Sequence, residues 1–147
     1  MPVTDLDGVT LTLTVPMPPT MMNRRSSNHW RAVHCAKLDY WERLDNLRLA
    51  SKCVQPDSLA CLAPFHVPEP PPEPLARVAV YSVMHLGGAM DDDNAMHRHK
   101  FLLDWLKSRE YIVDDRRKNL KWVSFPEQHV KRDGNYRITI SLSRIEE

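Results

Sequence analysis

Alternating apolar and polar positions mark four short segments of the chain as strands. Residues 9–15 (VTLTLTV) and 76–84 (ARVAVYSVM) alternate with a period of two and are rich in β-branched side chains, as is typical of strands with one buried face. Residues 121–125 (KWVSF) and 136–142 (YRITISL) alternate in the same way, with the turn sequence DGN at 133–135 between them. We therefore expect four strands, with 76–84 central and the last two joined through that turn.

Helical patterns occupy two longer segments between these strands. Residues 29–52 contain neither Gly nor Pro and repeat apolar residues at spacings of three and five, which favours a helix. Residues 92–109 predict a second helix, whose buried stripe is Ala95, His99, Leu102, Leu103 and Leu106. The order strand–helix–strand–helix–strand–strand predicts the α+β class, with a small mixed β-sheet of about four strands and two main helices packed against it.

Proline dominates one segment, at about 56–74, which ends in HVPEPPPEP. Such a run cannot donate a ladder of hydrogen bonds and favours the extended polyproline conformation. It predicts a stiff surface connector, and the alternative is a ligand for a partner domain. The whole chain, 1–147, is interpreted as a single domain in which this segment is an insertion.

Composition excludes several classes of protein. The formal charge is +1, from 20 Lys and Arg against 19 Asp and Glu, so a uniformly basic nucleic-acid binder is excluded but a local basic stripe is not. The three cysteines have no CxxC spacing, which disfavours zinc fingers and disulfide frameworks and favours a reducing cytoplasm. No apolar run of about 20 residues and no export signal is found, so we expect a soluble cytoplasmic protein without a membrane partner.

The strongest candidate for a metal-binding or catalytic motif is Asp91-Asp92-Asp93-Asn94, which follows a predicted strand and begins a predicted helix. One Asp is explained as a helix cap, but three adjacent carboxylates repel one another and favour a compensating cation such as Mg²⁺. In an extended stretch Asp91 and Asp93 point to the same side and converge on one ion. A second pair, Asp114-Asp115, follows the helix, and carboxylates that converge on Mg²⁺ are typical of phosphodiester hydrolysis. The alternative is that both groups are solvated helix flanks.

Basic residues accompany both acidic groups. Lys100 lies seven residues after Asp93 and four before Asp104, so one helix face carries all three, and the lysine is placed to stabilise a phosphate in a transition state. An ordinary Lys100–Asp104 surface pair is the alternative. Four cations follow the second acidic pair and suit a grip on a phosphate backbone, with a solvated charge run as the alternative; they are Arg116, Arg117, Lys118 and Lys121.

Taken in order, these motifs resemble the RusA-type Holliday junction resolvases. The resemblance rests on DxDN at 91–94, on K-x-x-x-D at 100–104 and on the apolar step into DD at 114–115 with the bases that follow. The opening PMPPTMMN at 16–23 and the last predicted strand also fit that family. The resemblance implies a small homodimeric endonuclease of DNA recombination and repair, often phage-borne, that cuts four-way junctions with Mg²⁺ or Mn²⁺.

By that resemblance, Asp91, Asp93 and Asp115 match the catalytic, metal-binding carboxylates, and Lys100 matches the catalytic lysine. The family's usual spacing places this lysine four residues after the second Asp, where the chain has His97, so His97 is the alternative proton donor. We expect backbone phosphates of branched DNA to contact Arg24, Arg25, Arg116, Arg117 and Lys118. A non-catalytic protein that binds branched DNA with the same fold is the alternative function.

Overall fold

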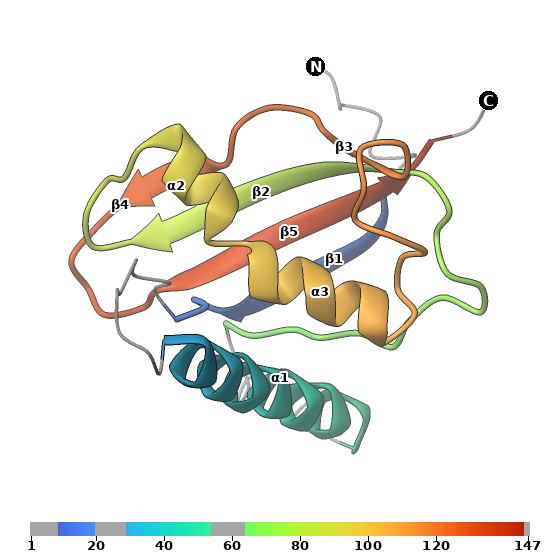
Figure 1. The fold of residues 1–147 in the computed structure, drawn as a ribbon, viewed down its shortest axis with the longest axis horizontal. Helices are drawn as coiled ribbons and strands as arrows, with labels where there is room; N and C mark the ends of the chain where they lie inside the picture. The colour runs from blue at the N-terminus through green and yellow to red at the C-terminus, as the bar shows by residue number, and fades with distance from the viewer. Residues whose placement is uncertain (1–8, 20–28, 54–63, 146–147) are drawn as a thin grey trace.

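The computed structural model describes residues 9–19, 29–53 and 64–145 of the 147-residue chain (Figure 1). Buried apolar side chains of the strands and helices form one hydrophobic cluster. None of the helices in these ranges is long and apolar enough to cross a membrane. The elements are β1 (Val9–Pro16), α1 (His29–Cys53), β2 (Val78–Leu86), α2 (Asp92–His97), α3 (Lys100–Ser108), β3 (Leu120–Trp122), β4 (Glu127–Val130) and β5 (Arg137–Arg144).

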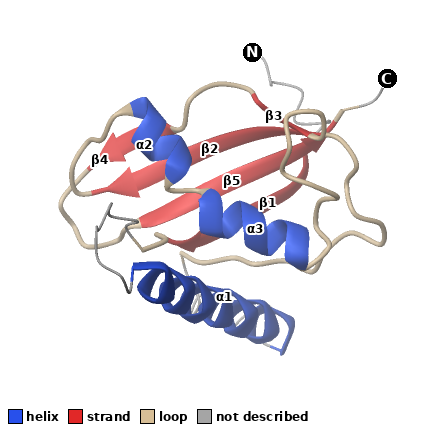
Figure 2. Ribbon diagram, in the orientation of Figure 1, coloured by secondary structure: helices blue, strands red, loops and turns tan. Residues whose placement is uncertain are grey.

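The sheet is mixed, and its central strand is β2. The order is β1-β5-β2-β3, and β4 also pairs with β2. β2 is antiparallel to β5 and parallel to both β3 and β4. Alternate residues of β2 are buried, and α2 and α3 lie across one face of the sheet while α1 lies along its β1 side (Figures 1 and 2). These features confirm the predicted α+β class and the central position of the second predicted strand.

The C-terminal strands differ from the prediction. β3 is shorter than the predicted 121–125, and the sequence pattern misses β4 altogether, so the described residues contain five strands rather than about four. The turn around Gly134 joins β4 to β5, but these two strands pair with β2 instead of with each other. The prediction that this turn joins the strand at 121–125 to the strand at 136–142 is therefore wrong. Strand β4 lies between them along the chain, and β3, β4 and β5 each pair with β2.

The predicted single helix at 92–109 is also wrong, because α2 ends at His97 and α3 begins at Lys100. The residues at the break are held by contacts outside the helices. His99 Nε2 lies 2.6 Å from Ser82 Oγ in β2, and Arg98 Nε donates to the backbone oxygen of Pro18 at 2.7 Å. The predicted stripe is nevertheless buried as expected, at Ala95, His99, Leu102, Leu103 and Leu106.

Helix α1 matches the predicted segment, but its apolar face is only partly buried. Leu44 is fully buried, and the buried Tyr40 hydroxyl donates to the backbone oxygen of Pro16 at 2.7 Å, which ties α1 to the end of β1. Trp30 and Leu38, in contrast, are 64% and 47% exposed. Leu49 is exposed as well, so the broken apolar spacing of this helix leaves three large side chains at the surface.

The described part of the Pro-rich segment, residues 64–74, is attached to the core. His66 exchanges two backbone hydrogen bonds of 2.8 Å with Thr14 in β1. Val67 is buried, and Pro68 accepts a 2.6 Å hydrogen bond from the Tyr111 hydroxyl. In Figure 1 this segment runs between α1 and α3. This part of the segment is therefore packed against the rest of the protein, and the remainder of the predicted insertion, 56–63, lies outside the described residues.

Candidate catalytic site

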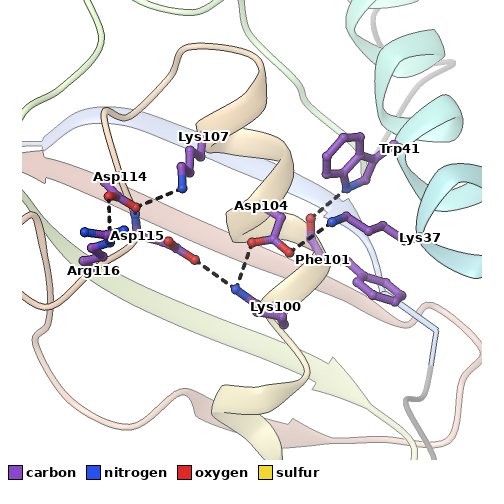
Figure 3. A network of polar contacts seen from close by, with 9 residues as sticks. All are labelled: Lys37, Trp41, Lys100, Phe101, Asp104, Lys107, Asp114, Asp115 and Arg116. Atoms are coloured by element: carbon purple, nitrogen blue, oxygen red, sulfur yellow. Dashed lines mark hydrogen bonds and ion pairs between the residues drawn. The ribbon is translucent and has the colours of Figure 1, made fainter. Parts of the chain in front are cut away.

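Lys100 is the residue that joins two of the sequence motifs in space. It is the first residue of α3, and its Nζ lies 2.9 Å from Asp104 Oδ1 and 3.2 Å from Asp115 Oδ2 (Figure 3). The other oxygen of Asp104, Oδ2, lies 3.4 Å from Lys37 Nζ on α1. The K-x-x-x-D motif and the DD motif therefore meet at one ammonium group.

The segment that follows α3 places the DD pair. Tyr111 and Ile112 are buried, and Leu75 exchanges backbone hydrogen bonds with Tyr111 and Val113, so the apolar step is fixed against the core. The two carboxylates that follow are then held by different partners. Asp115 faces Lys100, as described above.

Asp114 is enclosed by cations from both sides. Its Oδ1 lies 3.2 Å from Lys107 Nζ, and its Oδ2 lies 3.2 Å from Arg116 Nε (Figure 3). It also accepts the backbone N–H of Asp115 at 2.8 Å. Desolvation alone would raise the pKa of Asp114, but Lys107 and the Asp115 N–H outweigh it and hold this pKa below its ordinary value.

The first acidic motif is exposed at the start of α2. Asp91 is the N-cap, with φ −61° and ψ 150°, and its side chain makes no capping hydrogen bond. Asp92 and Asp93 already belong to the first helical turn, so the argument that Asp91 and Asp93 share one side of an extended stretch is wrong. Their carboxylates form no ion pair within the described part of the chain.

A residue that the sequence pattern did not single out holds this loop. Gln128 on β4 accepts the backbone N–H of Met90 at 2.9 Å and donates to the backbone oxygen of Met90 at 2.8 Å. Met90 immediately precedes Asp91. The side-chain amide thus fixes the backbone from which the first acidic motif begins, and only the unpredicted pairing of β4 with β2 brings it there.

The three predicted metal ligands are not gathered into one group. Across residues 9–19, 29–53 and 64–145, no three His, Cys, Asp or Glu side chains are placed to hold a metal ion. Asp91 and Asp93 fit Mg²⁺ in donor type, since this ion is commonly bound through one or two carboxylates and keeps several waters. Asp115 lies instead against Lys100, so the arrangement of all three does not match a preformed metal site.

Lys100 keeps its charge in this setting. The hydrogen bond to Asp104 raises the pKa of Lys100 above its ordinary value, and Asp115 contributes in the same direction. The group is therefore an ammonium at neutral pH and suits charge stabilisation rather than proton abstraction. His97 is exposed at the end of α2, and it is Lys100 that contacts the DD pair.

The predicted phosphate-binding residues divide into three groups. Arg24 and Arg25 lie outside the described residues. Arg116 is exposed and pairs with Asp114. Arg117 and Lys118 are exposed and line a groove of about 460 Å³, which Arg77 and Lys121 also line. Arg77 was missed because only the parallel pairing of β2 with β3 brings it beside these cations.

The protein is thus of the α+β class, and its Lys100 links helix α3 to the acidic motif at Asp114-Asp115. Models of known protein families give no match to this chain, and the curated proteins give none either. The resemblance to the RusA-type resolvases therefore rests on the motifs at 16–23, 91–121 and 136–142 alone.

Proposed function

We propose that this protein is a metal-dependent endonuclease of the RusA type, which resolves four-way DNA junctions or related branched DNA by paired nicks. The observation that carries the proposal is the position of Lys100 between Asp104 and Asp115. This lysine connects the K-x-x-x-D motif on α3 with the DD motif after α3, and a charged amine beside acidic groups is an arrangement suited to phosphoryl chemistry.

The carboxylates proposed to hold the metal are Asp91, Asp93 and Asp115. Asp91 and Asp93 are exposed and make no ion pair with a described residue, so their oxygens are accessible. Asp115 uses Oδ2 to accept from Lys100 at 3.2 Å. When bound, Mg²⁺ or Mn²⁺ would supply an activated water and neutralise charge on the leaving oxygen. Among the described residues these three side chains do not form a group placed to hold a metal ion.

Lys100 is proposed to bind a non-bridging oxygen of the scissile phosphate. Its ammonium is half-exposed, so a phosphate can approach it. Asp104 orients the amine from the next helical turn, and Lys37 neutralises the second oxygen of Asp104. Asp104 is thereby occupied on both oxygens, which favours Asp115 over Asp104 as the metal ligand.

Backbone phosphates of the DNA are proposed to contact Arg116, Arg117 and Lys118, and also Arg24 and Arg25. The first three are exposed and follow Asp115 directly, which places positive charge beside the proposed catalytic carboxylate. A homodimer with a two-fold axis would present two such sites, as paired nicks in a junction require.

Cleavage of a labelled four-way junction in Mg²⁺ or Mn²⁺ tests the proposal. Wild-type protein should nick opposing strands, and Asp91→Asn, Asp93→Asn and Lys100→Ala should each lower the cleavage rate about 100-fold or more. Asp39→Asn, at an exposed acid on α1, is the matched control and should cleave normally. Absence of cleavage by the wild-type protein with both metals, or full cleavage by Asp91→Asn and Asp93→Asn, would contradict the proposal.

A non-catalytic protein that binds branched DNA is the second candidate function. The observation that favours it is that no three acidic, His or Cys side chains among the described residues are placed to hold a metal ion. Such a protein would bind a four-way junction equally well in metal and in chelator, and it would produce no nicks. Gel-shift measurements beside the cleavage assay distinguish the two candidates.

A further inference from the structure

A basic groove whose described lining includes no residue of the two acidic motifs lies between α2, the start of β2 and β3. It has a volume of about 460 Å³. Four of its lining side chains are cationic, and none of the described residues that line it is acidic; the cations are Arg77, Arg117, Lys118 and Lys121. In a chain with a formal charge of only +1, this is a local concentration of positive charge that favours an anionic ligand.

The groove also has an apolar part. Met96 from α2 and Trp122 from β3 contribute half-buried side chains to its lining. The Trp122 ring is held edge-on against the His99 ring, with 5.1 Å between the centroids. A fixed indole beside cations is the combination that proteins use to bind nucleotides of single strands, with the base on the ring and the phosphate on the cations.

The backbone around the groove is fixed by hydrogen bonds. Asn119 donates from its side chain to the backbone oxygen of Ala76 at 2.9 Å, and its own backbone oxygen accepts the N–H of Val78 at 2.8 Å. On the other side, the N–H of Ile145 donates to the backbone oxygen of Arg77 at 2.9 Å. The cations therefore project from a rigid frame, which lowers the entropy lost when a ligand binds.

The volume limits what can enter. Sites for small organic molecules span about 300–1,000 Å³, so a groove of about 460 Å³ accommodates one nucleotide but not the width of a duplex. We propose that this groove binds an unpaired nucleotide of single-stranded DNA, with its phosphate on Lys118 and Lys121 and its base against Met96 and Trp122. The inference rests on the proposed function in naming DNA as the ligand, but it requires neither a metal nor cleavage.

Fluorescence anisotropy with a labelled oligothymidylate of about ten nucleotides, in chelator, tests this inference. The wild-type protein should bind this strand more tightly than a duplex of the same length. Lys118→Ala and Lys121→Ala should each weaken binding and reduce the slope of log affinity against log salt by about 0.7, as expected when one phosphate contact to a single strand is lost. Lys131→Ala, at an exposed cation after β4, is the matched control and should leave both quantities unchanged.

The aromatic contact has its own readout. Trp122→Leu should weaken binding about tenfold and leave the salt slope unchanged, because stacking releases no counterions. Met96→Ala should act in the same direction without touching the His99 contact, and thermal unfolding monitored by circular dichroism establishes that each variant is folded. Equal affinity for duplex and single strand, or equal effects of Lys131→Ala and Lys118→Ala, would overturn the inference.

The outcome is separable from that of the proposed function. A protein that binds the single strand in chelator but never cuts a junction supports the groove and contradicts the nuclease. A protein that cuts junctions in Mg²⁺ but does not bind the single strand contradicts the groove alone.

Discussion

Ser82 and His99 are joined in the interior by a hydrogen bond of 2.6 Å between Oγ and Nε2. Both residues are buried, and His99 Nδ1 lies 2.8 Å from the backbone oxygen of Ala95. Because a backbone oxygen only accepts, Nδ1 carries the proton, and Nε2 accepts from the Ser82 hydroxyl. The pair lacks the access that a catalytic serine needs, and it fixes the break between α2 and α3 against the central strand.

The protonation of His99 makes the free energy of unfolding depend on pH. Burial lowers the pKa of His99 to about 4, whereas an unfolded chain has the ordinary value near 6.5. Above about pH 6.5 the group is neutral in both states. As the pH falls from there towards about 4, only the unfolded chain takes up the proton, and the free energy of unfolding should decrease by about 3 kcal/mol.

Urea unfolding at several pH values measures this effect. The difference between wild-type and His99→Gln protein isolates the contribution of this residue from that of the carboxylates, and the variant should lose the decrease between about pH 6.5 and 4. His97→Gln, at the exposed neighbour, should retain it. An unchanged pH dependence in His99→Gln would show that the ring is not the group responsible.

The contact between Gln128 and Met90 predicts a positioning effect on the proposed catalytic acids. Gln128→Ala removes both hydrogen bonds to the backbone just before Asp91, so we expect cleavage to fall about tenfold and to require more Mg²⁺ for half-maximal rate. Stability should change by only about 1 kcal/mol, since the site lies near an edge of the sheet. The measurement is the cleavage rate against Mg²⁺ concentration.

Val130→Ala is the control for this variant, because Val130 is exposed on the same strand. It should leave the Mg²⁺ dependence unaltered. Amide hydrogen exchange at Met90 provides a readout that does not depend on cleavage, and exchange should be faster in Gln128→Ala. Equal exchange in wild type and variant would contradict the positioning role.

Three of the four predicted strands were predicted over nearly their full length, and these are the strands whose burial alternates. β1, β2 and β5 each have one buried face, so their apolar residues repeat with a period of two. β4 has the sequence EQHV, and its side chains lie mostly at the surface, so no apolar period marks it. The sequence pattern does not reveal the break between α2 and α3 either, because the positions of Ala95, His99 and Leu102 keep the helical spacing across it.

The candidate site was predictable only in part. The order of the motifs indicated that the DD pair follows the helix, and the structure brings Asp115 to Lys100. Which carboxylate faces the lysine depends on the burial of Tyr111 and Ile112, which is a property of the folded core. The basic groove depends on the parallel pairing of β2 with β3, and no local pattern encodes that pairing.

Alanine substitution should have unequal effects at two glycines, Gly134 in the turn between β4 and β5 and Gly88 in the loop after β2. Gly134 has a φ of +78°, in the left-handed region, so Gly134→Ala should lower the free energy of unfolding by about 1 kcal/mol. At Gly88 the space for a Cβ is open and φ is outside that region, so Gly88→Ala should be neutral or slightly stabilising. Urea unfolding compares them, and equal effects would show that backbone conformation at 134 is not limiting.

The contact of Asp45 with Arg109 and Trp105 predicts the largest change in stability among these variants. Arg109 binds both oxygens of Asp45, at 3.0 Å from Nε and 2.9 Å from Nη2, and the indole N–H of the buried Trp105 donates to Oδ1 at 2.9 Å. These contacts attach α1 to α3. The hydrogen bond to Arg109 holds the pKa of Asp45 below its ordinary value, so this stabilisation is present above about pH 4 and is lost as the pH falls further.

Removing the carboxylate leaves the Trp105 N–H without its acceptor. Asp45→Ala should therefore lower the free energy of unfolding by about 1–3 kcal/mol, and Asp45→Asn by less, because the amide oxygen still accepts from the indole. Asp39→Ala, at an exposed acid on the same helix, is the control and should change it by less than about 0.5 kcal/mol. Urea unfolding near neutral pH makes the comparison. If Asp45→Ala and Asp39→Ala were equally stable, the contact between α1 and α3 would not depend on this carboxylate.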